Sequence, residues 1–175
     1  MKYFVAARTQ PPHKGHISML EAACMEADEV VIGVGSANVI DARNPYTANE
    51  REMMLEKSLS DKGISNYRFV QIPDFHDDKS WVNYIQNVAE VDQDTTILSG
   101  NPWVAQAFSS RGYETQKPEE VISGDLVDIS ATRLRNMILN GDETWREYAA
   151  SGTVEYFEQF GGAERIAKFY QLAAK

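Results

Sequence analysis

The sequence contains a single cysteine, Cys24, among its 175 residues, so no internal disulfide is possible. Long apolar runs are missing as well, since none approaches the roughly 18 residues of a membrane-spanning helix. No basic leader followed by an apolar segment stands at Met1. From these absences we expect a cytoplasmic protein in a reducing compartment that makes no contact with a membrane.

Basic residues are also scarce. The chain has 17 Lys and Arg against 26 Asp and Glu, which gives a formal net charge of −9, and no block of basic residues occurs. A protein that follows a nucleic-acid backbone usually presents a basic stripe. We therefore expect no nucleic-acid partner, and we expect any anionic ligand to be bound by a few local groups.

The apolar content is sufficient for one globular core, because the chain is 43% hydrophobic and 25% charged. Short runs rich in β-branched and aromatic residues alternate with longer segments of helical periodicity, which is typical of a parallel sheet covered by helices. Residues 1–175 are expected to form one domain, a Rossmann-like, doubly wound α/β fold of about five strands. Its core would reach about residue 140, with a C-terminal helical part over 141–175.

The expected elements follow from this periodicity. Thr47 and Glu50 have the spacing of a capping box, so a helix is expected to begin there. Ser130 is a candidate N-cap for another helix, which Asn140 and Gly141 would end. The C-terminal part contains two amphipathic segments, 154–160 and 163–173, and predicts two helices. Strands are expected at 3–7, 29–35, 67–73, 95–100 and 113–117, and the other helices at 15–27, 48–60, 79–91, 102–110 and 131–139.

The stretch RTQPPHKGH (8–16) lies between the first expected strand and the first expected helix. In doubly wound folds, ligands bind at the carboxyl ends of the strands, near the point where strand order reverses. His13 and His16 would share one face of the first helical turn, where free backbone N–H groups and the helix dipole favour an anion. Gly15 leaves room for a phosphate to approach, and Arg8 would add a delocalised cation.

Two other interpretations of the histidine pair stay open at this point. The pair is half of a zinc site if His76, the remaining histidine, or distant carboxylates complete it. It is a polar helix start without function if nothing else in the sequence points to the same ligand.

A second stretch, ISATRLR (129–135), has similar chemistry. Ser130 and Thr132 offer hydroxyl and backbone N–H groups at a helix start, and Arg135 is placed to reach a phosphate. The alternative is a capped helix whose Arg133 and Arg135 lie on a solvated face. Two helix starts suited to anions in one α/β domain favour a polyphosphate held between them.

Both stretches resemble family motifs. HKGH (13–16) is similar to HxGH, and ISATRLR to ISxTxxR, the paired signatures of the nucleotidyltransferase α/β-phosphodiesterase superfamily. The wider chain, from residue 3 to about 169, resembles the archaeal-type nicotinamide-mononucleotide adenylyltransferases. The further matching segments are 7–16 (GRFQPxHxGH in the family), 35–37 (GSA), 44–51 (NPFTxxER), Asp74 with Trp81 (PD and a later Trp), 100–104 (GNxxV) and VEYFEQFGGAERI at 154–166.

The resemblance implies transfer of AMP from ATP to nicotinamide mononucleotide, which gives NAD and pyrophosphate. The phosphate of the mononucleotide is itself the nucleophile, so the protein must position two anions and offset their charge rather than supply a covalent Ser or Cys. A magnesium ion is expected to bridge the phosphates, held mainly by the nucleotide, with no metal site formed by protein ligands.

The resemblance also implies a role for each matching residue. Arg8, His13, His16 and Arg135 would be catalytic, with His16 at the α-phosphoryl group. The implied ATP-binding residues are Arg8, Gln10, His13, Gly15, His16, Gly100, Asn101, Ile129, Ser130, Thr132 and Arg135, and the implied acceptor-binding residues are Ser36, Arg43, Asp74, Asp78 and Trp81.

Asp78 is the departure from the family that bears most on the substrate. The family commonly has Asn at this position, three residues before the Trp that stacks on nicotinamide, here Trp81. An aspartate accepts a hydrogen bond from the carboxamide NH2 but repels the carboxylate of nicotinate mononucleotide. We therefore expect a preference for the amide substrate. The alternative for Trp81 is a core position on a helix.

Two other functions stay open. One is a sister transferase that adenylates another phosphorylated acceptor, such as phosphopantetheine, FMN or nicotinate mononucleotide; the NPYTANER segment (44–51) and the Asp74 and Trp81 pair speak against it. The other is a non-enzymatic nucleotide sensor, which the joint presence of both histidines and both arginines disfavours. We also expect a homo-oligomer, with a candidate interface on the aromatic C-terminal residues Tyr156, Phe157, Phe160, Phe169 and Tyr170.

Overall fold

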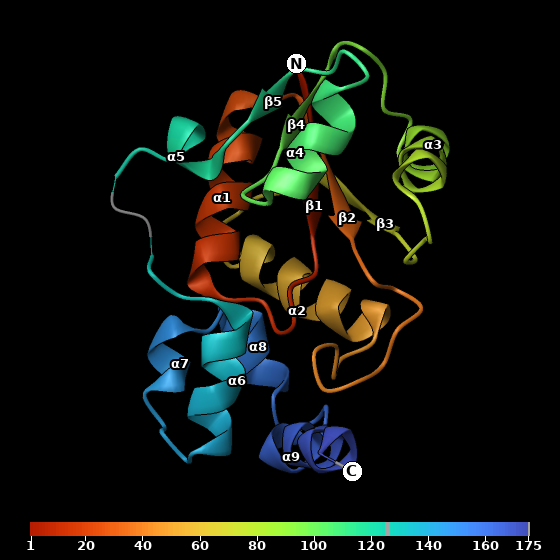
Figure 1. Cartoon of the computed structure of the whole chain (residues 1–175). Coiled ribbons are helices and arrows are strands. Elements are labelled where there is room, and N and C mark those ends of the chain that lie inside the picture. The colour runs from red at the N-terminus through yellow and green to blue at the C-terminus, as the bar shows by residue number, and fades with distance from the viewer. Residues whose placement is uncertain (125–126, 175) are drawn as a thin grey trace.

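Parallel strands form the centre of the structure, a computed structural model that describes residues 1–124 and 127–174. Within these residues, five strands pair in the order β3-β2-β1-β4-β5 (Figure 1). The doubly wound α/β fold expected from the sequence is thereby confirmed. The strands are β1 (Lys2–Ala7), β2 (Glu29–Val34), β3 (Tyr67–Gln71), β4 (Thr95–Leu98) and β5 (Thr115–Gln116).

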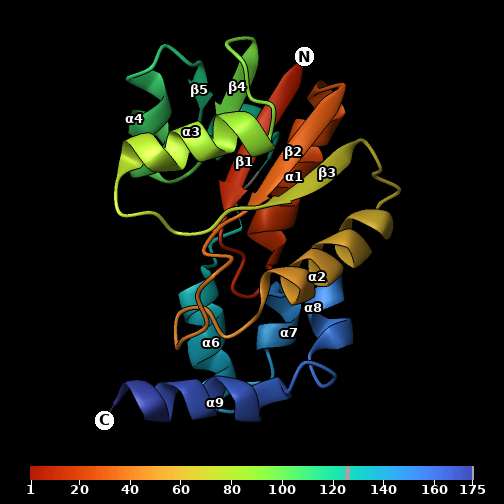
Figure 2. The same cartoon turned by 90° about the vertical axis from the view of Figure 1, so that its right-hand side faces the viewer.

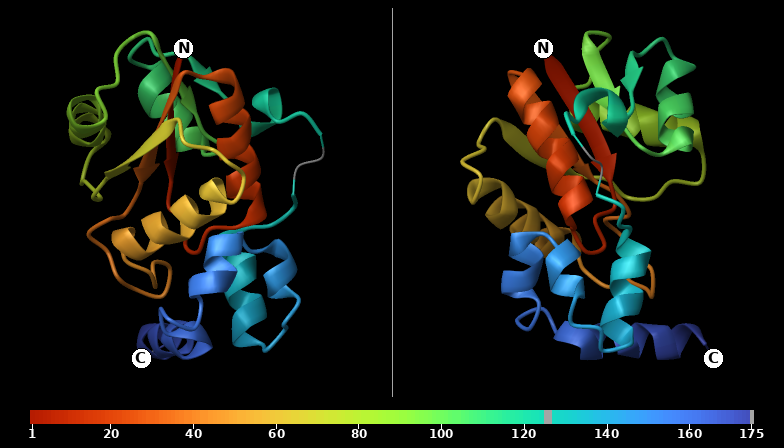
Figure 3. Two further views of the ribbon diagram at one scale, coloured as in Figure 1. Left: turned by 180° about the vertical axis from the view of Figure 1, so that it is seen from behind. Right: turned by 90° about the vertical axis from the view of Figure 1, so that its left-hand side faces the viewer.

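Helices cover both faces of this sheet (Figure 2). Side chains of α1, α2 and α5 pack on one face, and side chains of α3 and α4 pack on the other. The remaining helices gather below the carboxyl edge of the sheet, as both views of Figure 3 show. The helices are α1 (Lys14–Glu26), α2 (Ala48–Ser60), α3 (Asp78–Val88), α4 (Pro102–Ser109), α5 (Pro118–Val121), α6 (Ala131–Leu139), α7 (Trp145–Tyr148), α8 (Ser151–Tyr156) and α9 (Gly162–Ala173).

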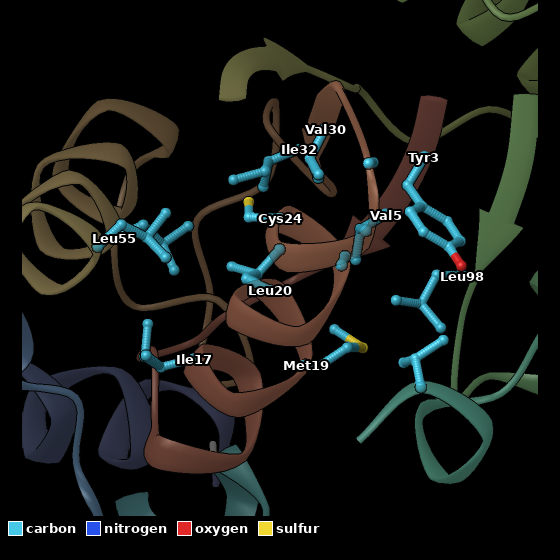
Figure 4. Close-up of a cluster of buried hydrophobic side chains, with 14 of the residues drawn as sticks. Tyr3, Val5, Ile17, Met19, Leu20, Cys24, Val30, Ile32, Leu55 and Leu98 are labelled. Carbon is cyan, nitrogen blue, oxygen red and sulfur yellow. The ribbon is translucent and has the colours of Figure 1, made fainter. Parts of the chain in front are cut away.

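Successive side chains of β1 point to opposite faces of the sheet, and each face has its own apolar cluster. Tyr3 and Val5 face α1 and α2, whereas Phe4, between them, packs with α3 and α4. Figure 4 shows the first cluster, in which Leu20 of α1 lies near Val5. Because both faces are covered, the central strands are buried on both sides, which explains their nearly continuous apolar sequence.

The predicted helix caps are present. Thr47 Oγ1 accepts a hydrogen bond from the Glu50 N–H at 3.2 Å, and the Glu50 carboxylate accepts from the Thr47 N–H at 2.8 Å. Ser130 Oγ caps α6 through the Arg133 N–H at 3.2 Å. The sequence thus predicted both the start of α2 and the start of α6 from side chains that satisfy free N–H groups.

The helix predicted over 163–173 is present as α9, whereas α8 begins and ends earlier than predicted and α7 was not predicted. The segment 154–160 is helical only to Tyr156, since the chain turns through Gly161 and Gly162, whose φ angles of 98° and 51° suit glycine. A third apolar cluster joins these helices to α2 and α6. None of the helices described for residues 1–124 and 127–174 has the length and apolar character needed to span a membrane.

Candidate active site

A cavity of about 1270 Å³ opens at the carboxyl ends of β1, β2 and β4. It lies where the strand order reverses, because β2 and β3 extend the sheet on one side of β1, and β4 and β5 on the other. In the described part of the chain, every predicted site residue lines this cavity except Asp78. Those residues are Arg8, Gln10, His13, Gly15, His16, Ser36, Arg43, Asp74, Trp81, Gly100, Asn101, Ile129, Ser130, Thr132 and Arg135.

His13 and His16 cap the start of α1 reciprocally. Nδ1 of each imidazole accepts a hydrogen bond from the backbone N–H of the other residue, both at 3.3 Å. The two rings stack with centroids 3.6 Å apart and planes at 26°. Because both Nδ1 atoms are acceptors, each neutral ring carries its proton on Nε2. The cap therefore leaves two Nε2–H groups as donors for a ligand.

Burial keeps both rings uncharged. Desolvation lowers the pKa of His13 to about 4, and burial followed by the charge of His13 lowers the pKa of His16 well below its ordinary value. The pair therefore offers hydrogen bonds rather than positive charge at neutral pH. The cap also uses the backbone N–H of His16, so the N–H groups of Lys14 and Gly15 are the ones left for an anion at this helix start.

The turn before His13 is held by the C-terminal part of the chain. The carbonyl of Pro12 accepts hydrogen bonds from Thr153 Oγ1 at 2.8 Å and from the Ala150 N–H at 3.3 Å. At Gly15, an added Cβ would lie 3.2 Å from Cε1 and Nδ1 of His13, which is tighter than ordinary contact. Gly15 thus makes room for the His13 ring in addition to any room it leaves for a phosphate.

Arg135 is 5% exposed, so the alternative that placed it on a solvated face was wrong for this residue. Its Nη1 donates to the Gln10 carbonyl at 2.7 Å and its Nη2 to Thr132 Oγ1 at 3.3 Å, while the buried Nε has no partner among the described residues. The Gln10 amide exchanges two hydrogen bonds with the backbone of Tyr46, at 2.8 and 3.0 Å. A buried arginine with an unused donor beside the cavity suits an anionic ligand.

The groups predicted for the acceptor lie on the other side of the cavity. Ser36 Oγ donates to Asp74 Oδ1 at 2.9 Å, which joins the loop after β2 to the loop after β3. Arg8 and Arg43 line the cavity with exposed side chains. Because neither guanidinium is fixed by an ion pair among the described residues, both can turn toward bound phosphates.

Trp81 is both a core residue and a cavity residue. It is 8% exposed and packs edge-on against Phe108 at 5.8 Å, yet it also lines the cavity. The Oδ1 of Asp78 accepts a hydrogen bond from Nε1 of Trp103 at 3.2 Å. Asp78 is exposed and is not among the residues that line the cavity, so its direct contact with a carboxamide stays a prediction.

Arg51 supports the site and was not predicted from the sequence. It is fully buried, and its Nη1 donates to the carbonyls of Arg8 at 2.6 Å and Gly35 at 2.7 Å. The next residues, Thr9 and Ser36, have φ angles of 48° and 50°, so one guanidinium holds two strained strand ends. The sequence feature that could have indicated its burial is its position three residues before Met54, on the apolar face of α2. Other lining residues not predicted include Trp103, Pro118, Glu119, Ile122, Val127 and Tyr170.

The donor set of the cavity does not form a metal site by itself. No group of three or more His, Cys, Asp or Glu side chains is placed to hold an ion in the part of the chain that the structure describes. The histidine Nδ1 atoms are already engaged in the cap. A metal ion bound here would therefore take most of its ligands from a phosphate-bearing substrate.

A doubly wound sheet with a histidine cap after β1 and a second capped helix start across one cavity is the arrangement of a nucleotidyltransferase. Residues 7–137 match the cytidylyltransferase-like family. The chain is 36% identical over 169 residues to the nicotinamide-nucleotide adenylyltransferase of Thermococcus sibiricus, covering 95% of this chain and 88% of that protein. It is 32% identical to that of Picrophilus torridus, with 95% of each chain covered. The chain therefore belongs to the nicotinamide-nucleotide adenylyltransferase family.

A solved structure supports the fold. The bifunctional NMN adenylyltransferase/ADP ribose pyrophosphatase of Francisella tularensis, complexed with AMP and a manganese ion, superposes with a TM-score of 0.77 at 20% identity. The match covers 97% of this chain and 52% of that one, so the chain spans about half the length of the bifunctional protein.

Proposed function

We propose that the protein transfers AMP from ATP to nicotinamide mononucleotide, forming NAD and pyrophosphate. The observation that carries this proposal is the arrangement of two capped helix starts around one cavity, with buried His13, half-buried His16 and buried Arg135 between them. Such groups suit a polyphosphate better than any other common ligand. Family membership supports the choice of substrates, because the relatives are named for this reaction.

In the proposed reaction, a phosphate oxygen of the mononucleotide attacks the α-phosphorus of ATP. The new P–O bond joins the two mononucleotides, and the bond from the α-phosphorus to the bridging oxygen breaks with departure of pyrophosphate. The protein need only align these groups and stabilise charge that moves to the leaving group. The Nε2–H groups of His13 and His16 would donate to the α-phosphoryl oxygens, and Arg8 and Arg135 would neutralise the leaving pyrophosphate.

Neutral histidines suit this role. A preformed donor that stays uncharged stabilises a developing negative charge without first attracting a competing anion, and its geometry is fixed before substrate arrives. Here the reciprocal cap fixes both rings, since each Nδ1 is engaged at 3.3 Å. We assign positive charge to the arginines and directional hydrogen bonds to the histidines.

We also propose that Mg²⁺ accompanies ATP. The ion would be held mainly by phosphate oxygens, in keeping with a cavity whose described residues form no carboxylate cluster. When bound, it would offset phosphate charge. Asn101 and Ser130, the caps of α4 and α6, would lie on the adenosine side, and Ser36 with Asp74 on the side of the acceptor.

The test is incubation with ATP, Mg²⁺ and a panel of phosphorylated acceptors, following both pyrophosphate and dinucleotide. We expect NAD from nicotinamide mononucleotide and little product from phosphopantetheine or FMN. Faster turnover of another acceptor would contradict the substrate assignment. ATP binding by calorimetry with no pyrophosphate from any acceptor would instead indicate a nucleotide sensor.

A further inference from the structure

Trp103 lines the cavity and contacts residues of both proposed sides, Asn101 on one and Trp81 on the other. It lies in the first turn of α4, directly after Gly100 and Asn101 on the proposed adenosine side, and Asn101 Oδ1 accepts from its backbone N–H at 3.0 Å. Its side chain lines the cavity and is 44% exposed, which is high for so large an apolar group. An exposed aromatic surface inside a ligand cavity indicates a contact that a substrate completes.

The contacts of this indole connect it to the proposed acceptor side. Its ring centroid lies 4.7 Å from that of Trp81, with the planes at 50°. Its Nε1–H donates to Asp78 Oδ1 at 3.2 Å. Trp81 is mostly covered, and Asp78 does not line the cavity. Of the three side chains, Trp103 therefore offers the most surface to a ligand in the cavity.

We propose that Trp103 is a specificity-determining residue for the acceptor. This inference rests on the proposed function. With Trp81 it forms an aromatic wall for the planar base of the mononucleotide, and Asp78 is a positioning residue that holds the indole. The wall fits a base that is cationic and carries no acidic substituent.

The charge of the base gives this wall its selectivity. The N-glycosylated pyridine ring of nicotinamide mononucleotide is positively charged, and the face of an indole attracts a cation. The carboxylate of Asp78, which accepts the hydrogen bond of the indole Nε1–H, adds negative potential at this end of the cavity. A carboxylate on the base would be repelled by this negative potential. The amide form is therefore favoured over the acid form by electrostatic potential and aromatic stacking rather than by a direct hydrogen bond.

Three variants separate the wall from the charge. Trp103→Ala removes the wall, Trp103→Phe keeps an aromatic face but loses the bond to Asp78, and Asp78→Asn keeps an acceptor for the indole but loses the charge. Met25→Ala, at an 82% exposed position on α1, is the control for truncating an exposed apolar side chain. Steady-state kinetics with ATP and each mononucleotide, together with unfolding midpoints, give the comparison.

We expect Trp103→Ala to raise KM for nicotinamide mononucleotide roughly three- to thirty-fold, as for loss of a partly desolvated cation–π contact. KM for ATP should change by less than about twofold, since the distant contacts of ATP are retained. Trp103→Phe should give a smaller rise. Asp78→Asn should raise the amide KM less than Trp103→Ala does, because the aromatic face is kept, and should narrow the preference for amide over acid.

The outcomes distinguish this inference from the proposed function. If the unmodified protein forms NAD but Trp103→Ala leaves both KM and the preference for the amide unchanged, the role of Trp103 is overturned and the function stands. Equal increases in KM for ATP and for the mononucleotide would also overturn it, because Trp103 would then act through the start of α4. If the unmodified protein forms no dinucleotide from either mononucleotide, the proposed function itself fails.

Discussion

The two sides of the cavity are built differently. On the proposed phosphate side, Gln10, His13 and Arg135 are at most 7% exposed, while His16 is half-buried and Arg8 is exposed. Hydrogen bonds connect this side to the segment before α2, to α6 and to the C-terminal part. On the proposed acceptor side, Ser36 and Trp81 are buried, but residues 74–80 are all exposed. The contacts of this exposed segment with the rest of the fold include the bonds from Ser36 to Asp74 and from Trp103 to Asp78.

The difference indicates which part of the site determines the reaction and which part determines the acceptor. A buried array with fixed donors is preorganised for charge that develops on phosphates. An exposed loop with few contacts tolerates substitution, so a change such as Asp78 can alter the acceptor without disturbing the phosphate groups. Changes on the phosphate side should therefore cost turnover, and changes on the acceptor side should alter selectivity.

The strongest test of this contrast is His16→Ala. The substitution removes one fixed Nε2–H donor, and loss of such a donor typically costs about a hundred- to a thousandfold in kcat. We expect a loss of this size with ATP and nicotinamide mononucleotide, measured by NAD formation, and a smaller change in KM. The control is His76→Ala, because His76 is exposed and does not line the cavity. Near-normal turnover of His16→Ala would contradict the role of His16 as a hydrogen-bond donor to the α-phosphoryl group.

The next largest effect should come from Arg51, which supports the phosphate side without lining the cavity. Arg51→Met would leave the buried carbonyls of Arg8 and Gly35 without their donor, and we expect a loss of about 3 kcal/mol in unfolding free energy. Urea unfolding measures this loss. Arg133→Met is the matched control, since Arg133 is exposed on α6. If both variants lose equally little stability, the two strand ends do not depend on Arg51.

Stability should also depend on pH through His13. Its folded pKa of about 4 lies below the ordinary value of 6.5, so as the pH falls the unfolded chain binds the proton first. The stability that this neutral ring contributes is complete above about pH 6.5 and is lost between pH 6.5 and 4, and the loss at pH 4.5 is about 2 to 3 kcal/mol.

The variant His13→Asn isolates this contribution. Asparagine is a good N-cap and does not titrate, so the helix start is kept while the proton is removed. Between pH 7 and pH 4.5, the unfolding free energy of the unmodified protein should fall by about 2 to 3 kcal/mol more than that of the variant. If the unfolding free energies of the two proteins fall in parallel with pH, the conclusion that burial lowers the pKa of His13 is contradicted.

The sequence predicted local features well because they depend on neighbouring residues. The strands, the caps at Thr47 and Ser130 and the histidine turn all follow from patterns of a few positions. It could not predict that Arg51 reaches the Arg8 carbonyl or that Thr153 holds Pro12, because these contacts join segments 43 and 141 residues apart. The sequence could not predict the bond between Asp78 and Trp103 either, since the two residues lie 25 positions apart on different helices.

The smallest expected effect comes from Gly15→Ala, which tests how tightly the phosphate side is fitted. Alanine is favoured over glycine in a helix by up to about 1 kcal/mol, and its Cβ would press on the His13 ring at 3.2 Å, so the net change in stability should be within about 1 kcal/mol. Displacing the ring by a few tenths of an ångström should lower kcat by about fivefold, because alignment of the donor is lost. Lys14→Ala, one residue earlier on an exposed position, controls for the change in helix propensity. If Gly15→Ala instead raises KM for ATP and leaves kcat unchanged, the role of the glycine is to leave room for the phosphate and not to fix the position of the His13 ring.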